Sequence, residues 1–260
     1  MSETTYAEAI REGFREAMRH DPSVLLIGLG VPDPKGFFGT TSGLQEEFGA
    51  SRVMDMPCSE NGMTGVVLGA SLNGIRPVLN HQRLDFALFG GQIHAPVVFR
   101  MILGRGWGQG PQHSQALHGW FAHVPGLKVV MPACPQDAKG LMIAAIEDPN
   151  PVVYIDHRWL HHVRGPVSPG RASTPIGPLR VARTGRDVTL VAVSYMVLEA
   201  LEAAEKLAGE GIEAEVLDLR CLRPLDRGGI LDSVRKTGRL AVVDQAWPSA
   251  GKFTPRWCSG

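Results

Sequence analysis

The stretch DVTLVAVSYMVLEALEAAEKLAGEGIEAEVLDLR, residues 187–220, carries the pattern that decides the fold. Residues 187–194 are an apolar run typical of a buried strand, and residues 197–209 have the apolar spacing of a helix that ends at a glycine. A strand is expected next at residues 213–220, then a helix at 225–237 and a strand at 240–244. Alternating strands and helices of this kind predict a parallel, doubly wound sheet, because each helix returns the chain to the same end of the sheet.

The same alternation extends back to the N-terminus. Apolar strands are expected at residues 24–28, 52–56, 76–80, 97–103, 127–131 and 152–156, and helices at residues 5–20, 61–72, 114–123 and 135–147. In the first helix, Ala7, Ile10, Phe14 and Met18 share one face. Residues 157–186 are polar and rich in glycine and proline, so they are expected to be a linker. We therefore predict an α/β protein with a doubly wound, parallel-sheet domain at 1–156 and a smaller α/β domain at 187–260.

Composition excludes several classes of protein. The chain has 26 basic and 26 acidic side chains, whereas a nucleic-acid-binding domain is expected to have a basic excess. The N-terminus is polar, and no run of apolar residues is long enough to cross a bilayer. The four cysteines show no metal-ligand spacing, which favours free thiols in a reducing compartment. The sequence thus predicts a cytoplasmic protein that binds neither nucleic acid nor membrane.

Two residues are candidates for catalysis from their positions. Glu60 follows a predicted strand and begins a predicted helix, at the edge of the sheet where ligands gather in open α/β folds. A glutamate at that position is also explained by the helix dipole alone. His113 follows a glycine-rich loop, and a loop histidine is a natural acid–base group, although it is equally explained as a surface residue. His161 and His162, in the linker, are expected to be solvated, and His118 to pack or form a local hydrogen bond.

The glycine-rich loop at residues 104–110, GRGWGQG, lacks the motifs of common nucleotide-binding loops. No Gly-Lys-Ser/Thr follows it, and it has no Gly-x-Gly-x-x-Gly arrangement. The chain also has no Gly-x-Ser-x-Gly motif. The sequence therefore does not favour an ordinary nucleotide enzyme or an α/β hydrolase.

Several longer stretches resemble one family along nearly the whole chain. They are FGTTSGLQEEFGASRVMDMPCSENGMTG at 38–65, GQGPQHSQALHGWFAHVPGLKVVMPA at 108–133, DAKGLMIAAIEDPNPVV at 137–153, and DLRCLRPLD at 218–226. In these stretches the chain resembles the beta subunit of the decarboxylating component of 2-oxoacid dehydrogenase complexes. This family is transketolase-like and depends on thiamine diphosphate. The resemblance implies a pyrimidine-binding domain followed by a transketolase C-terminal-like domain, which is shortened here.

The resemblance implies roles for particular residues. Glu60 matches the glutamate that shares a proton with a nitrogen of the cofactor's pyrimidine ring and thereby activates the cofactor. His113 matches a histidine that handles protons during acyl transfer, and Phe86 is the nearest match to a phenylalanine that stacks on the pyrimidine. Leu29 stands where the family has a glutamate beside the cofactor. Residues 145–150 match a potassium-binding loop, in which Ala145, Asp148 and Asn150 are the expected ligands.

The resemblance also implies partners. The family holds the diphosphate through magnesium and a Gly-Asp-Gly segment, which this chain lacks. An alpha-type subunit is therefore expected to hold both, in an α₂β₂ assembly with a shared active site. A lipoyl acyltransferase core is a further expected partner.

The chain departs from the family in three places. Leu29 lies in the run Gly28-Leu29-Gly30 instead of Gly-Glu, and His81 and Gln82 replace an acidic–aromatic pair. About one helix is expected to be missing between Phe86 and Val97. The second domain ends early, after residue 244.

These departures leave two alternatives open. One is half of a split transketolase that transfers ketol units, for which Arg83, Arg100 and Arg105 are candidate ligands of sugar phosphates. The other is a non-catalytic interaction subunit, which the missing helix and the short C-terminus favour.

Overall fold

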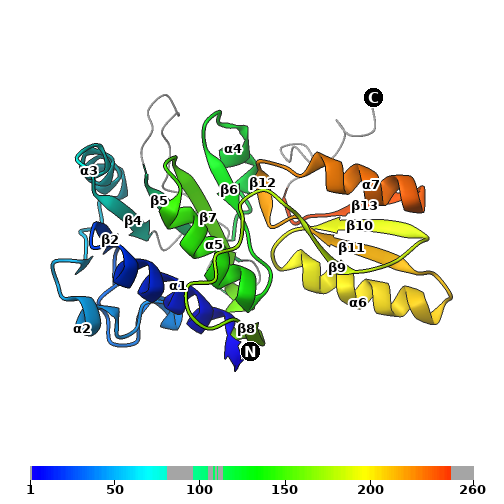
Figure 1. The fold of residues 1–260 in the computed structure, drawn as a ribbon, viewed down its shortest axis with the longest axis horizontal. Coiled ribbons are helices and arrows are strands. Elements are labelled where there is room, and N and C mark those ends of the chain that lie inside the picture. Colours follow the sequence, from blue (N-terminus) through cyan, green and yellow to red (C-terminus); the bar gives the residue numbers. More distant parts are fainter. Residues whose placement is uncertain (1, 81–95, 105–107, 109, 111–113, 247–260) are drawn as a thin grey trace.

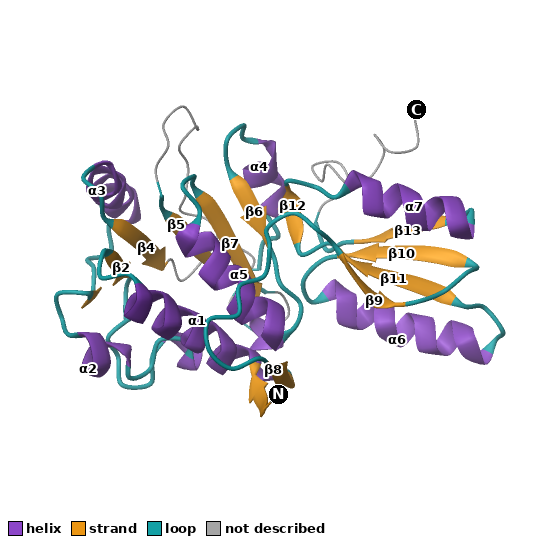
Figure 2. Ribbon diagram, viewed as in Figure 1, coloured by secondary structure: helices purple, strands orange, loops and turns teal. Residues whose placement is uncertain are grey.

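The structure is a computed structural model that describes residues 2–80, 96–104, 108, 110 and 114–246. It forms two α/β units joined side by side (Figure 1). Both have a mostly parallel sheet between helices, as the sequence predicts (Figure 2). Along the described part of the chain, no helix has the length and hydropathy needed to cross a membrane.

The first unit is built on a seven-stranded sheet with the order β12-β6-β7-β5-β4-β2-β3. Its strands are β2 (Val24–Ile27), β3 (Val53–Met54), β4 (Arg76–Asn80), β5 (Val98–Leu103), β6 (Lys128–Val130), β7 (Val152–His157) and β12 (Cys221–Arg223). All neighbouring pairs are parallel except β12 with β6. Parallel strands that are buried on both faces are mostly apolar. Strands β5 and β7 are buried along their whole length and are apolar except for Arg100 in β5 and Asp156 and His157 in β7.

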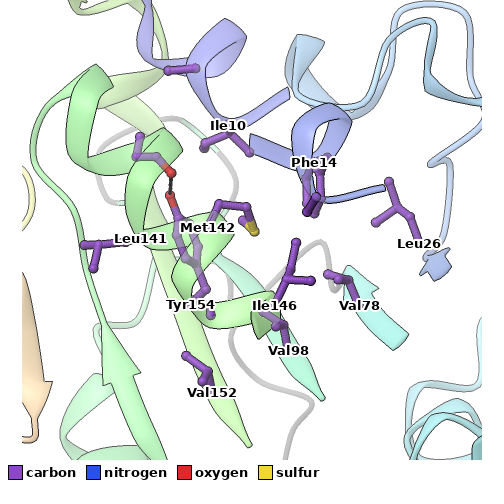
Figure 3. Packing of buried hydrophobic residues seen from close by; sticks show 14 of the residues in the cluster. Ile10, Phe14, Leu26, Val78, Val98, Leu141, Met142, Ile146, Val152 and Tyr154 are labelled. Atoms are coloured by element: carbon purple, nitrogen blue, oxygen red, sulfur yellow. Dashed lines mark hydrogen bonds between the residues drawn. The ribbon is translucent and has the colours of Figure 1, made fainter. Parts of the chain in front are cut away.

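Helices α1 (Tyr6–His20) and α5 (Pro135–Glu147) pack together over one face of this sheet. The four residues predicted to share a face of the first helix, from Ala7 to Met18, are all buried. Figure 3 shows Ile10 and Phe14 of α1 beside Met142 and Ile146 of α5, above Val78 and Val98 of the sheet. Thr5 begins α1 with a capping box: its hydroxyl accepts from the backbone N–H of Glu8, whose carboxylate accepts from the backbone N–H of Thr5.

The opposite face is covered by α3 (Glu60–Leu72), α4 (His118–His123) and the second unit. Helix α2 (Leu44–Phe48) and the 3-10 turn η1 (Phe37–Gly39) lie between β2 and β3. One apolar core combines Phe121 and Val129 of the first unit with Val191, Leu217 and Ile230 of the second. The two units therefore share a core.

The predicted linker contains regular structure. It includes the 3-10 turn η4 (Arg158–His162), β8 (Arg164–Val167), which pairs antiparallel with β1 (Ser2–Thr5), and β9 (Arg180–Arg183). Strand β9 is the edge strand of the second sheet, whose order is β13-β10-β11-β9.

The second sheet contains the predicted βαβαβ unit. Strands β10 (Val188–Ala192), β11 (Ala214–Asp218) and β13 (Leu240–Val243) are parallel, and α6 (Met196–Gly209) and α7 (Arg227–Thr237) connect them. Strand β12 leaves this unit and pairs with β6 of the first sheet. The second unit thus completes the sheet of the first.

Candidate functional site

The carboxyl ends of the parallel strands of the first sheet meet at one edge, which is where ligands bind in folds of this kind. Asp55, just after β3, joins two loops at this edge. Its Oδ1 accepts from the backbone N–H of Gly30 at 2.8 Å and from that of Met56 at 2.9 Å. Residues 28–30 and 55–59 are therefore held side by side, as the parallel register of Ile27 with Met54 requires.

This arrangement brings together the backbone positions of two predicted site residues. Leu29 lies in the first of these loops, partly buried against the apolar core. Glu60 is the first residue of α3, directly after the second loop. The side chain of Glu60 lies outside what the structure describes. The first turn of a helix exposes backbone N–H groups, which favour a carboxylate and an electron-rich ring nitrogen nearby.

Other predicted site residues lie outside the described residues. These are His113 and Phe86, together with His81, Gln82, Arg83 and Arg105. Their roles, and the place of the expected missing helix, stay predictions from the resemblance.

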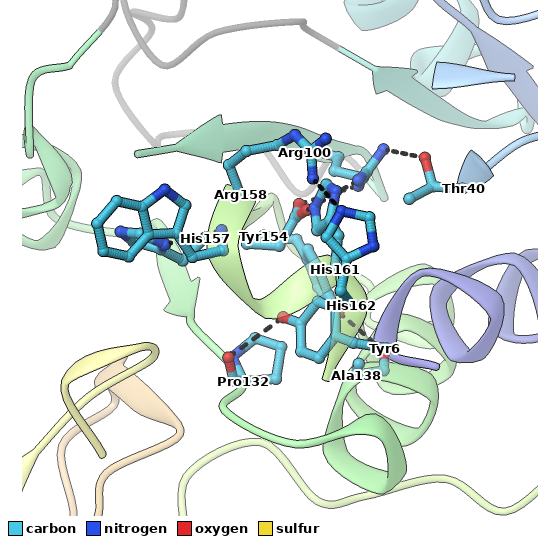
Figure 4. A network of polar contacts seen from close by, with 12 residues as sticks. Tyr6, Thr40, Arg100, Pro132, Ala138, Tyr154, His157, Arg158, His161 and His162 are labelled. Atoms are coloured by element: carbon cyan, nitrogen blue, oxygen red, sulfur yellow. Dashed lines mark hydrogen bonds and ion pairs between the residues drawn. The ribbon is translucent and has the colours of Figure 1, made fainter. Parts of the chain in front are cut away.

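Behind the edge lies a buried polar network centred on Arg100 (Figure 4). Arg100 Nε and Nη2 donate to the two oxygens of Asp156 at 3.0 and 2.9 Å, and Nη1 donates to Asn80 Oδ1 at 2.6 Å. Nη1 also lies 3.0 Å from the hydroxyl of Thr40. Arg100 was a candidate ligand of sugar phosphates in the split-transketolase alternative. That assignment is wrong, because its guanidinium is fully buried and bound to these groups.

The prediction that His161 is solvated is also wrong. His161 is buried, because η4 packs against α1 and places its ring beside that of Tyr6. Its Nε2 donates to Asp156 Oδ2 at 2.6 Å. Burial lowers the pKa of His161, although Asp156 opposes this shift. Burial alone raises the pKa of Asp156, but Arg100 and His161 outweigh it and hold that pKa below its ordinary value. His162 is exposed, as predicted.

The predicted potassium loop has its carboxylate already paired. Asp148 ends α5 and forms an ion pair with the ammonium of Lys128. Its other oxygen, Oδ1, accepts from the backbone and side-chain N–H groups of Asn150 at 2.9 and 3.0 Å. Ala145 is buried inside α5. Both oxygens of Asp148 thus have partners within the chain, and potassium binding at this loop stays a prediction from the resemblance.

The described residues include an exposed free thiol, Cys58, two positions before Glu60. They contain no group of three histidines, cysteines or acidic residues placed to hold a metal ion. Burial raises the pKa of the Cys134 thiol to about 12, which leaves it protonated and unreactive.

Sequence reasoning missed Asp55, Asn80 and Asp156 as supports of the edge. Each lies at the carboxyl end of a strand or directly after it, which is a signal that the sequence did contain.

Comparison with known proteins identifies both units. Residues 2–161 match the transketolase pyrimidine-binding domain, and residues 177–253 match the transketolase C-terminal domain. Among solved structures, a chain of a split-gene transketolase, described as an inactive beta4 tetramer, has the same fold. Its TM-score is 0.78 at 23% identity, over 94% of this chain and 82% of that chain.

Among curated proteins, the pyruvate dehydrogenase E1 component subunit beta-2 of Oryza sativa is 41% identical over 269 residues. The match covers 96% of this chain and 72% of the rice protein. The acetoin:2,6-dichlorophenolindophenol oxidoreductase subunit beta of Cupriavidus necator is also 41% identical, over 92% of this chain and 78% of that protein. Because the rice alignment runs over 269 positions and this chain has 260 residues, the rice protein has residues in the aligned region without a counterpart here.

The order of the two matched domains and the identity to these subunits lead to one conclusion. The chain belongs to the transketolase-like family of E1 beta subunits of 2-oxoacid dehydrogenase complexes.

Proposed function

We propose that the chain is the beta subunit of a thiamine-diphosphate-dependent 2-oxoacid dehydrogenase component and is active only with an alpha-type subunit. The observation that carries this proposal is the 41% identity to a pyruvate dehydrogenase E1 beta subunit across 96% of the chain. The geometry of the carboxyl edge supports it, because Asp55 holds the loop of Leu29 beside the start of α3, where Glu60 lies.

The residue types at the edge support binding of the pyrimidine half of thiamine diphosphate. Such a ring needs an apolar wall and a carboxylic acid at a ring nitrogen, and Leu29 and Glu60 are of these types. Glu60 would hold the proton that is shared with the ring nitrogen, and His113 would handle protons during acyl transfer. The cofactor, when bound, supplies the electron sink for loss of carbon dioxide from a 2-oxo acid.

The diphosphate and its magnesium are assigned to the partner. Phosphates and magnesium need several oxygen ligands, and the sequence lacks the family's Gly-Asp-Gly segment. The relatives are named as beta subunits, which supports an alpha-type partner. The α₂β₂ assembly and a lipoyl acyltransferase core as acceptor are proposed from the resemblance alone.

Two substrate classes have equal support from the relatives, since a pyruvate enzyme and an acetoin enzyme are both 41% identical to this chain. A screen should therefore include 2-oxo acids and acetoin. A cytoplasmic location stays a prediction from the sequence, and the rice relative is named as mitochondrial.

The test is calorimetric titration of thiamine diphosphate and magnesium into the chain alone and into its mixture with the alpha-type subunit. Binding only in the mixture, followed by turnover of a 2-oxo acid or acetoin, is the expected result. Absence of binding in both cases would leave the non-catalytic interaction subunit as the better account.

A further inference from the structure

Two buried histidines of the first unit contact consecutive residues of the second. His118 Nε2 lies 3.1 Å from Asp244 Oδ2, and His157 Nε2 lies 3.2 Å from Gln245 Oε1. Asp244 and Gln245 directly follow β13, at the carboxyl end of the second sheet. Both histidines are at most 1% exposed. The end of β13 is thus docked on the first unit through polar contacts inside a buried interface.

His118 is the first residue of α4, which has six residues. A helix of that length is not stable by itself, and its cap residue, Leu117, makes no side-chain hydrogen bond to the helix. Phe121 and Ala122 anchor the later part of α4 in the core that both units share. The start of α4 therefore depends on a contact from outside the helix, and Asp244 provides one.

The hydrogen bond has a defined direction. The carboxylate of Asp244 can only accept, so Nε2 of His118 carries the shared proton. The other oxygen of Asp244 accepts from the backbone N–H of Ala246 at 3.2 Å, which fixes the carboxylate in place. Burial alone raises the pKa of Asp244, but His118 and the backbone N–H groups of Ala246 and Gln245 outweigh it, so the pKa lies below its ordinary value.

Helix α4 belongs to a connection that begins at the carboxyl edge of the first sheet. It lies on the connection that leaves the carboxyl end of β5 and returns as β6. Because parallel strands end at one edge, this connection begins at the edge where α3 begins. A small displacement of groups at such an edge costs a large factor in rate.

We propose that Asp244 of the second unit is a positioning residue that fixes the start of α4 through His118. By holding α4, it helps to set the geometry of the carboxyl edge of the first sheet, where the cofactor is proposed to bind. This inference rests on the proposed function for its effect on turnover, and on the structure alone for its effect on α4. The second unit thus has a positioning role in addition to the apolar core that it shares with the first unit.

The test compares variants that remove the hydrogen bond with variants that keep it. Asp244→Ala and His118→Ala remove it, whereas Asp244→Asn keeps an acceptor and His118→Gln keeps a donor near the position of Nε2. His118 Nδ1 has no hydrogen-bond partner among the described residues, so glutamine loses no contact that the structure describes there. Asp232→Ala is the matched control, because it removes an exposed aspartate from the same unit.

We expect Asp244→Ala and His118→Ala each to lower kcat by about tenfold to a hundredfold with little change in KM, in the complex with the alpha-type subunit. The double variant should be no worse than either single variant, because both remove the same contact. Asp244→Asn and His118→Gln should keep most of the wild-type kcat. Wild-type kcat in both alanine variants, or strictly multiplicative losses in the double variant, would overturn the proposal.

A second measurement needs no cofactor. Hydrogen exchange of residues 118–123 in the full chain alone should be faster in Asp244→Ala than in the wild type, and unchanged in Asp232→Ala. Unchanged exchange in Asp244→Ala would overturn the proposal even if kcat fell. If Asp244→Ala does not fold, the comparison of His118→Ala with His118→Gln decides the matter. A wild-type complex without turnover would contradict the proposed function, while the exchange experiment would still test the anchoring of α4.

Discussion

Arg100 on β5 and Asp156 on β7 form a bidentate ion pair, with both side chains 0% exposed. The register explains how they meet. Arg100 lies opposite Tyr154, so Asp156, two residues further along β7, is its diagonal neighbour on the same face of the sheet. Asn80, opposite Arg100 on β4, accepts a third hydrogen bond from the guanidinium. One guanidinium thus links three adjacent strands, β4, β5 and β7, behind the carboxyl edge of the first sheet.

Arg100→Met should destabilise the protein strongly. It leaves Asp156 buried without its main cation, and breaking a buried pair in this way costs about 3–5 kcal/mol. The free energy of unfolding, measured in urea, checks this. Arg235→Met is the control, since Arg235 forms an exposed pair on α7 and should cost less than about 1 kcal/mol. A loss from Arg100→Met no larger than that of the control would contradict the structural role of the network.

Glu8 should make the stability of the chain depend on pH in acid. The backbone N–H of Thr5 and the hydroxyls of Thr5 and Thr4 lower the pKa of Glu8 from 4.5 to about 2. A depressed pKa adds stability that is fully present above pH 4.5 and is lost as the pH falls toward 2. In Glu8→Gln the decline of unfolding free energy across this window should be shallower than in the wild type. Equal slopes in thermal unfolding at several pH values would argue against the capping box.

Two glycines should respond to alanine with opposite sign. A Cβ at Gly28 would lie 2.4 Å from the backbone oxygen of Asn80, so β2 and β4 would have to move apart. Gly28→Ala should therefore cost about 1–3 kcal/mol. A Cβ at Gly65 in α3 meets no heavy atom of the described residues within 4 Å, so Gly65→Ala should stabilise the isolated chain by about 0.5–1 kcal/mol. Chemical denaturation of both variants tests this. A stabilised Gly28→Ala would contradict the close packing at Gly28, and a destabilised Gly65→Ala would contradict the open space at Gly65.

Local patterns predicted most of the fold, and non-local pairing explains the rest. The capped, amphipathic α1 and the apolar run of β5 form where the sequence predicts them, because periodicity reflects burial. Strand β12 could not be predicted in the first sheet, since its three residues pair with β6, far back along the chain. His161 lies in a polar stretch rich in glycine and proline, and only its contacts with Tyr6 and Asp156 show that it is buried. The position of Glu60 at the start of α3 followed from the order of strand and helix alone.

Glu60→Gln should leave the fold intact and abolish most decarboxylation in the complex with the alpha-type subunit. Glutamine keeps the shape of the side chain but has no carboxylic proton to share with a pyrimidine nitrogen, and loss of such acid–base catalysis costs about 10²–10⁴ in rate. Release of carbon dioxide from the 2-oxo acid is the measurement, with circular dichroism to verify folding. Glu46→Gln is the control, because Glu46 is an exposed glutamate on α2. Wild-type decarboxylation by Glu60→Gln would remove the glutamate from the proposed site.

His113→Ala should separate the two half-reactions. If the histidine handles protons during acyl transfer, transfer to a lipoyl domain should fall by about 10²–10⁴, the usual contribution of a general acid or base. Decarboxylation, followed with an artificial electron acceptor, should fall much less, because Glu60 and the cofactor carry that step. His162→Ala is the matched control, since His162 is exposed on η4 and far along the chain from this loop. Equal losses in both half-reactions would show that His113 acts on the cofactor or the fold, and not on acyl transfer.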